Sequence, residues 1–172
     1  EIPADLARKA RAEELEVFKE RNVYEVVPRT HMRRGAKIIG VRWVETNKGT
    51  NDEPKIRSRL VCQELGYGSK TPEEMFAPTP PLVATRWLLS GAASQGGFGL
   101  ERVMLLDFKR AFLYGACERE LYIELPEDDP RKQGGRNVGR LLKAMYGTRD
   151  APSVWQKMVK AMLLERGFEA SK

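Results

Sequence analysis

The stretch VMLLDFKRAFLYG, residues 103–115, decides how the rest of the chain is interpreted. It opens with four apolar residues, which predict a buried strand over residues 102–108, because a strand covered on both faces carries apolar side chains without alternation. Asp107 then lies at the end of that strand, on a rigid support. Hard cations such as Mg²⁺ take carboxylate ligands, but single acids at strand ends are also common. The position alone leaves both interpretations of Asp107 open.

Hydrophobic periodicity and turn residues predict that helices and strands alternate along the chain, which is typical of an α+β fold. A turn rich in Asn, Gly, Asp and Pro separates two of the strands and predicts a β-hairpin. A loop dense in Gly and Pro is expected over residues 66–81. The expected helices span residues 4–22, 82–94 and 138–146, with a last helix capped by Asp150 and ended by Gly167; the expected strands span 23–27, 37–46, 55–63, 102–108 and 121–125.

The composition favours an intracellular protein with anionic partners. The net charge is +6 and the sequence pI is about 9.4, which suits nucleic acid, nucleotides or anionic lipid. Two cysteines and one histidine argue against a disulfide framework and against a zinc enzyme. No apolar stretch is long enough to cross a bilayer. The chain starts at Glu1 without an initiator methionine or a signal peptide, so we expect it to come from a longer polypeptide.

Three cations are expected on one face of the predicted hairpin. Lys55, Arg57 and Arg59 are spaced two apart, and residues two apart on a strand point to the same side. Arginine forks match phosphate oxygens. The face is interpreted either as a clamp on a triphosphate or nucleic-acid backbone, or as an ordinary solvated face of an exposed sheet.

Apolar surroundings predict core positions, and charged loops predict surface positions. The tryptophans could alternatively stack on bases, the histidine could contact nucleic acid, and an acidic run could bind a cation. The expected core residues include Trp43, Trp87, Trp155, Cys62 and Cys117, and the expected surface positions are His31 and the acidic run at residues 127–129.

Residues 107–115 follow the pattern Asp-x-Lys-x-Ala-Phe-Leu-x-Gly, the first catalytic motif of copia-type reverse transcriptases, and the chain resembles that family. Each further match is short, but all come in the family's order and spacing, over roughly residues 14–168. The matches are VRWV at 41–44 with Lys48, RSRLV at 57–61, FAP at 76–78 with Arg86, ELYI at 120–123 with Pro126, LKAMYG at 142–147, and Ala151, Pro152 and Trp155. An unrelated basic α+β domain would require all of these matches to be coincidence.

The resemblance implies a right-hand polymerase, with β-hairpin fingers and a partial palm whose strands pack on helices. The whole chain, residues 1–172, would be a partial reverse transcriptase domain. Residues up to about 101 would form the N-terminal helix and the fingers, and residues from about 102 would begin the palm. The implied activity is RNA-directed DNA polymerisation, in which two Mg²⁺ ions assist transfer of a deoxynucleotide to a primer 3′ end.

The same resemblance implies the roles of individual residues in this reaction. Asp107 would be catalytic and bind metal, and the Phe108 carbonyl would reach the same ion. Phe112 would form the floor under the nucleotide sugar, although an ordinary core phenylalanine is the alternative. Arg57 and Arg59 would hold the incoming triphosphate.

The implied partners are an RNA or DNA template with its primer and deoxynucleoside triphosphates, besides the rest of the polymerase and the RNase H region of a polyprotein. No membrane is implied. The location would be cytoplasmic or nuclear, or a virus-like particle if the element is active. Gly147 would lie against the templating base pair, where the lack of a side chain permits close approach. The expected nucleic-acid contacts are Lys48, Lys55 and Arg149.

Some positions depart from the family pattern. Asp150 stands where the family usually has Gln, Gln63-Glu64 replaces a small-basic pair, and Arg110 replaces Thr. An acid near a phosphate-handling site is unfavourable, unless Asp150 serves only as a helix cap. The family's Tyr-x-Asp-Asp motif does not occur in the 172 residues, so we expect no polymerase activity from this polypeptide alone. The alternative function is a non-catalytic nucleic-acid-binding remnant of a decayed or domesticated element.

Overall fold

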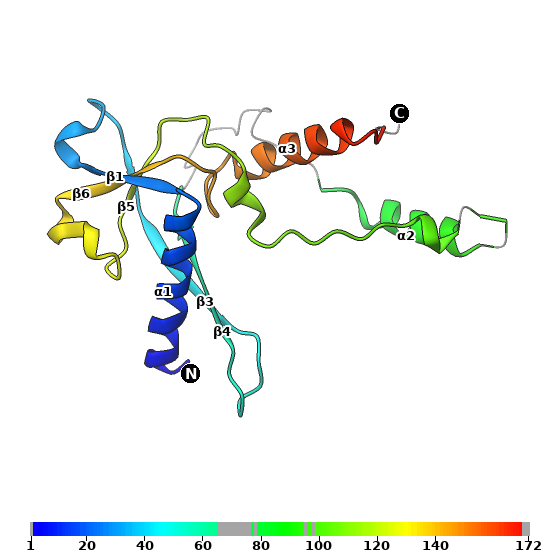
Figure 1. Cartoon of the computed structure of the whole chain (residues 1–172), viewed down its shortest axis with the longest axis horizontal. Coiled ribbons are helices and arrows are strands. Elements are labelled where there is room, and N and C mark those ends of the chain that lie inside the picture. Colours follow the sequence, from blue (N-terminus) through cyan, green and yellow to red (C-terminus); the bar gives the residue numbers. More distant parts are fainter. Residues whose placement is uncertain (1, 65–76, 78, 95, 98, 170–172) are drawn as a thin grey trace. The chain divides into compact units, whose positions relative to one another are not determined.

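The computed structural model describes residues 2–64, 77, 79–94, 96–97 and 99–169, and it has a mixed α+β architecture with two sheets (Figure 1). The chain divides into unit 1, Glu1–Phe76 with Ala111–Lys172, and unit 2, Ala77–Arg110, which are described separately. Most of the predicted loop over residues 66–81 lies outside the described residues. No helix in the described part is long and apolar enough to cross a membrane. Units 1 and 2 do not correspond to the predicted fingers and palm, which are lobes defined by the family resemblance. The division into fingers and palm therefore stays a prediction.

Helix α1, Ala4–Glu20, opens unit 1 and packs along strand β4. Its buried residues Ala7, Ala10, Glu14 and Phe18 recur every three or four positions, which is the spacing of one helix face. The predicted helix over 4–22 is confirmed to within two residues at its end.

The larger sheet has four strands in the order β1-β6-β5-β2. They are β1, Tyr24–Pro28, β2, Ile38–Ile39, β5, Tyr122–Glu124, and β6, Asn137–Leu141. The pairs β1/β6 and β5/β6 are antiparallel, while β2/β5 is parallel. The strand predicted over 23–27 and the one predicted over 121–125 are both confirmed as β1 and β5.

The prediction of a helix over residues 138–146 is wrong, because residues 137–141 form strand β6 in the middle of the sheet. A short apolar run fits either structure, and pairing on both sides decides for a strand. Gly139 allows the close packing there, since a Cβ at this position would come within 2.9 Å of Ile123 and 3.1 Å of the Tyr24 ring.

The second sheet is the predicted hairpin of β3, Val41–Asn47, and β4, Ile56–Cys62. The Asn47 side chain stabilises the turn, because its Oδ1 accepts hydrogen bonds from the backbone N–H groups of Gly49 and Lys55 at 2.9 and 3.0 Å. The strand predicted over 37–46 is interrupted at Gly40, so that β2 and β3 join different sheets.

The core of unit 1 lies where α1, the hairpin and the larger sheet meet. Both predicted core cysteines pack there, Cys62 fully and Cys117 partly buried. The buried members of this cluster are Phe18, Val23, Tyr24, Leu60, Cys62, Leu113, Ile123, Leu125, Leu141 and Met145.

Helix α3, Ala151–Glu165, is the last regular element. Its predicted apolar stripe from Trp155 to Leu163 is only half-buried, and the fully buried positions are at the start of the helix. Gly167 ends the helix as predicted: its φ is +82°, and Phe168 N–H donates to the Leu163 carbonyl at 3.1 Å. Short 3₁₀ turns occur at Arg29–His31 (η1), Leu100–Arg102 (η3), Ala111–Tyr114 (η4) and Pro130–Gly135 (η5).

Unit 2 contains α2, Leu82–Ala93, close to the predicted helix, but the strand predicted over 102–108 is wrong. Met104, Leu105 and Leu106 are 65%, 96% and 52% exposed, and no described strand pairs with this segment. Apolar composition alone does not make a strand, because strands form only with a hydrogen-bonded neighbour. Trp87, predicted in the core, is also exposed.

Candidate nucleotide and nucleic-acid interface

Strand β4 presents its arginines on the face opposite to α1. Ser58, Leu60 and Cys62 are buried, so Arg57 and Arg59 point to the other side by alternation. Arg42 is paired with Val61 across the hairpin and shares that side, where it is exposed. Lys55, also exposed, directly precedes β4. We call the set Arg42, Lys55, Arg57 and Arg59 the cationic face.

The cationic face has no acid to neutralise it within the two strands. The residues opposite Arg57 and Arg59 are Thr46 and Val44. Glu45 points to the other side, where its carboxylate accepts a hydrogen bond from Arg11 Nε at 2.7 Å. Four cations with no salt-bridge partner among the described residues attract polyanions more strongly than paired surface cations do.

Arg59 is the most constrained cation of this face. Its guanidinium lies 5.9 Å from the centre of the Tyr146 ring, within cation–π range. Its Nε is buried and has no hydrogen-bond partner among the described residues. A buried donor without an acceptor costs stability.

Tyr146 continues the interface to Phe112. The two rings pack edge to face with centroids 5.2 Å apart. Phe112 is half-buried and packs on a small cluster of Ala144, Ala151 and Val154. Sequence reasoning did not select Tyr146, although this aromatic residue directly precedes the glycine of the matched LKAMYG motif.

Gly147 follows Tyr146 and lies directly against the end of β4. Its φ is +84°, and a Cβ there would come within 2.0 Å of the Cys62 carbonyl oxygen. The Cys62 N–H donates to the Tyr146 carbonyl at 2.7 Å, which fixes the two segments together. The glycine is therefore required by backbone packing, whatever else it contacts.

Arg119 joins three segments through two carboxylates. Its Nε and Nη2 donate to Asp150 at 2.8 Å each, and its Nη1 and Nη2 donate to Glu64 at 2.7 and 2.9 Å. Glu64 also accepts a hydrogen bond from the Arg149 backbone N–H at 2.8 Å. The end of β4, the loop before β5 and the start of α3 are thereby held in one arrangement.

This network corrects the predicted role of Asp150. Asp150 stands at the N-cap position of α3, but its side chain makes no capping hydrogen bond and binds Arg119 instead. Burial acts to raise the pKa of Glu64 and of Asp150. The hydrogen bonds from Arg119 favour the charged carboxylates more strongly, so both pKa values lie below normal. Two acids that depart from the family pattern thus share one arginine, which offsets much of the negative charge.

The remaining predicted site residues are not part of the row from Arg59 to Phe112 or of the Arg119 side-chain contacts. Lys48 is in the hairpin turn and exposed, and Arg149 is half-buried. Asp107 and Phe108 belong to unit 2, where Asp107 is exposed. Among the described residues, no group of three or more His, Cys, Asp or Glu side chains could hold a metal ion. Asp107 by itself does not make a magnesium site, which needs several oxygen ligands.

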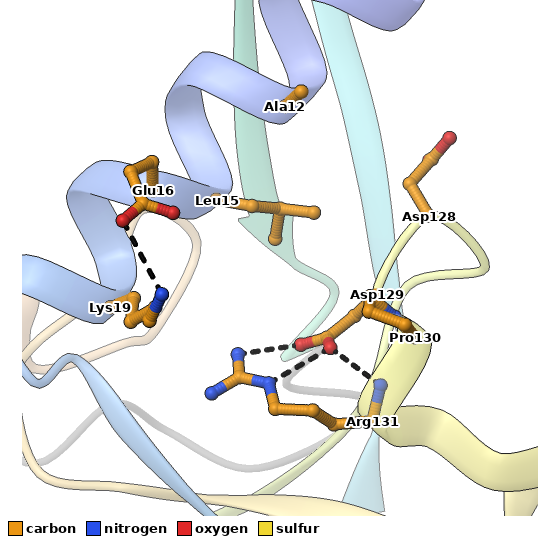
Figure 2. A pocket seen from close by; sticks show the side chains of 8 residues that line it. All are labelled: Ala12, Leu15, Glu16, Lys19, Asp128, Asp129, Pro130 and Arg131. Atoms are coloured by element: carbon orange, nitrogen blue, oxygen red, sulfur yellow. Dashed lines mark hydrogen bonds and ion pairs between the residues drawn. The ribbon is translucent and has the colours of Figure 1, made fainter.

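A pocket of about 290 Å³ lies between α1 and the loop before β6, and it contains none of the predicted site residues. Figure 2 shows Asp129 among the lining residues, where its carboxylate accepts hydrogen bonds from the Arg131 side chain at 2.9 and 2.8 Å. The prediction of a wholly solvated acidic loop is wrong for Asp129, which is buried and also accepts a hydrogen bond from the Tyr24 hydroxyl at 2.8 Å. His31 is exposed, as predicted.

Comparison with known proteins identifies relatives that match most of the chain. The sequence model of the reverse transcriptase (RNA-dependent DNA polymerase) family matches residues 21–172. The chain is 32% identical over 150 residues to a retrovirus-related Pol polyprotein from transposon TNT 1-94 of Nicotiana tabacum, covering 86% of this chain and 11% of that protein. It is 31% identical over 136 residues to the retrovirus-related Pol polyprotein from transposon RE2 of Arabidopsis thaliana, covering 76% of this chain and 9% of that protein. The chain thus spans about a tenth of the length of these relatives, and no solved structure matches it significantly.

Proposed function

This chain belongs to the reverse transcriptase family, as a domain of a copia-type Pol polyprotein, and from this premise we propose that it holds the nucleotide and template of an RNA-directed DNA polymerase. In this proposal the hairpin and α1 belong to the fingers, and the segment from about residue 102 begins the palm. The expected partners are a template with its primer, deoxynucleoside triphosphates and the rest of the polyprotein.

The row from Arg59 through Tyr146 to Phe112 is the observation that supports this proposal. Arg59 stands beside two packed rings, and its buried Nε has no hydrogen-bond partner among the described residues. Phosphate oxygens fit the arginine, and sugar or base fits an aromatic wall. Arg57 and Arg42 extend the positive charge along the hairpin, with Lys55 and Lys48 nearer its turn, and they would contact phosphates of the nucleotide or template.

Gly147 adds a surface without a side chain next to this row. Its close packing on Cys62 leaves the turn exposed on its other side, where a base pair could approach. Arg149, two residues further on, would contact the nucleic-acid backbone. Phe112 would support the sugar ring.

Asp107 is proposed as one ligand of a catalytic Mg²⁺, with the Phe108 carbonyl beside it. The described residues do not complete such a site. Further ligands have to come from outside them, and nucleotide phosphates could supply some. The 172 residues also contain no Tyr-x-Asp-Asp motif, and for that reason we expect no primer extension from them alone.

The test compares binding and chemistry. Fluorescence anisotropy with a labelled template–primer would measure binding by wild type, by an Arg42→Gln/Arg57→Gln variant, and by an Arg8→Gln/Lys9→Gln control, whose cations are exposed on α1. Two lost phosphate contacts should weaken binding roughly tenfold or more near 0.1 M salt, and the control should match wild type more closely. Equal binding by both variants would refute the proposed interface.

Chemistry is tested by primer extension with Mg²⁺ in a Pol polyprotein that contains this domain. Asp107→Asn should abolish extension while template–primer binding persists. Binding without extension in the unmodified polyprotein would favour a non-catalytic nucleic-acid-binding module instead. Extension by the 172-residue chain alone would contradict the expectation that it lacks a complete metal site.

A further inference from the structure

A second basic surface lies away from the hairpin, in the connection between β1 and β2. Residues 29–37 contain four arginines or lysines and one histidine, without any acid. Arg33, Arg34 and Lys37 are all exposed. The proposed nucleotide interface makes no use of this connection.

The fold brings a further cation to the same place. Strand β1 ends opposite the start of β6, with Pro28 paired to Asn137. The Arg29 N–H donates to the Arg136 carbonyl at 3.0 Å, and the Arg29 Nε donates to the Gly135 carbonyl. Figure 1 shows the loop after β1 and the segment before β6 at the same end of the sheet. Arg136 is exposed, and we call Arg33, Arg34, Lys37 and Arg136 the outer basic surface.

Two neighbouring acids, Glu124 and Glu127, pair with cations outside this surface. Glu124 pairs with Arg29 and, at 3.7 Å, with Lys132, which also pairs with Glu127. The cations of the outer basic surface therefore face few local counter-charges.

Only one of the four has an ion pair among the described residues. Arg33 lies 3.5 Å from Glu120, and its side chain is 76% exposed, so solvent and salt screen that pair strongly. For Arg34, Lys37 and Arg136 the described residues provide no salt-bridge partner.

The backbone of this connection is fixed without using the exposed side chains. The Met32 N–H donates to the Arg29 carbonyl at 3.3 Å, and the Ala36 N–H donates to the Arg33 carbonyl at 3.0 Å. The Arg29 side chain anchors the loop to Gly135 and Glu124. A loop that is already ordered has less entropy to lose when a ligand binds.

We propose that the outer basic surface binds the phosphate backbone of nucleic acid, as a contact separate from the cationic face. The proposal rests on the proposed function, which supplies a nucleic-acid partner. Three arginines and a lysine carry guanidinium and ammonium groups that suit phosphates, so we expect the contact to be largely independent of sequence. An anionic membrane is less favoured, since residues 29–37 expose no large apolar side chain that could insert.

The experiment measures affinity for a labelled single-stranded RNA by fluorescence anisotropy between 50 and 300 mM NaCl. The tested variant is Arg34→Gln/Lys37→Gln/Arg136→Gln. For single-stranded nucleic acid, each phosphate contact contributes about 0.7 to the slope of log affinity against log salt concentration. The variant should therefore lose about two units of slope and 10- to 100-fold in affinity near 0.1 M salt, equally for two RNA sequences.

Matched variants separate the possible outcomes. Arg8→Gln/Lys9→Gln/Lys160→Gln removes the same charge from other exposed positions and should keep most of the slope. A variant with Arg34→Lys and Arg136→Lys should bind as wild type does. Circular dichroism and a thermal midpoint equal to wild type would show that the neutral variant is folded.

The inference is overturned if the neutral variant behaves like its control. If the Arg42→Gln/Arg57→Gln variant still loses binding in that case, the proposed function stands and only the second surface fails. Loss of binding to phosphatidylserine vesicles without loss of RNA binding would assign the surface to lipid and also overturn the inference. No RNA binding by wild type at all would overturn both proposals.

Discussion

Replacing Arg119 with methionine should destabilise unit 1 more than any exposed charge substitution. Methionine keeps much of the aliphatic volume but removes four hydrogen bonds to Glu64 and Asp150. Both carboxylates bind the same Nη2, so their nearest oxygens lie within about 6 Å of each other. The substitution leaves two partly buried acids facing each other without a cation.

The magnitude follows from these distances. Two like charges at about 6 Å repel by roughly 3 kcal/mol at an effective dielectric constant of 20. Removing one partner from a fully buried ion pair costs about 3–5 kcal/mol. These side chains retain 11–28% of their exposure, which lowers the expected loss to about 2–3 kcal/mol. For a chain of this length, that corresponds to a thermal midpoint lower by about 4–12 °C.

The pH dependence makes the test specific. In wild type the pKa values of Glu64 and Asp150 are lowered, so their stabilisation is present above the normal pKa near 4 and is lost as pH falls through the folded-state values. In Arg119→Met, burial and mutual repulsion raise both pKa values, so protonation relieves the strain. The deficit relative to wild type should therefore be largest near pH 7 and shrink toward pH 4.

Thermal and urea unfolding, followed by circular dichroism at pH 7, 5.5 and 4, measure this deficit. Arg140→Met is the control, because Arg140 pairs with Glu25 on an exposed part of the sheet, and its midpoint should stay close to wild type. A deficit for Arg119→Met that is independent of pH, or no larger than that of the control, would refute the reasoning.

Three further predictions concern single positions. Gly147→Ala should cost about 1–3 kcal/mol more in unfolding free energy than Gly35→Ala, since both have positive φ but only Gly147 would place its Cβ against backbone; equal losses by urea denaturation would contradict this. Burial raises the pKa of the Cys62 thiol to about 12, so iodoacetamide should modify Cys62 at pH 8 only after unfolding, as peptide mass spectrometry can show. Tyr24→Phe removes the hydrogen bond to Asp129 and should cost about 1 kcal/mol near pH 7. Burial raises the pKa of Tyr24, so this stabilisation is present below pH 10 and is lost above it, and a difference between variant and wild type that does not shrink above pH 10 would argue against the assignment.

Elements with strong local signals could be predicted from the sequence. The periodicity of α1 and the turn chemistry between β3 and β4 act over a few residues, so neither needed tertiary information. Gly167 was identified as a helix end for the same reason, because a positive φ there suits glycine. The common side of Arg57 and Arg59 followed from strand alternation alone.

Elements whose identity depends on distant partners were predicted wrongly. The apolar pattern of residues 137–141 is too short to distinguish a helix from a strand. Their pairing with β1 and β5 is what makes them strand β6. Residues 102–108 look like a buried strand, yet in the structure they have no described neighbour to pair with. Local pattern cannot supply a hydrogen-bonded partner.

The sequence by itself determined the family, the helices with clear amphipathic spacing, the hairpin and the basic character of one of its faces, because each of these depends on residue types at short, fixed intervals. Only the tertiary structure decided which side chains share a site. Arg119 reaches Glu64 across 55 residues and Asp150 across 31, and Tyr146 lies between Arg59 and Phe112. Such contacts depend on how strands pair and how helices pack, and hydrophobic burial that drives this packing does not specify in advance which polar groups meet.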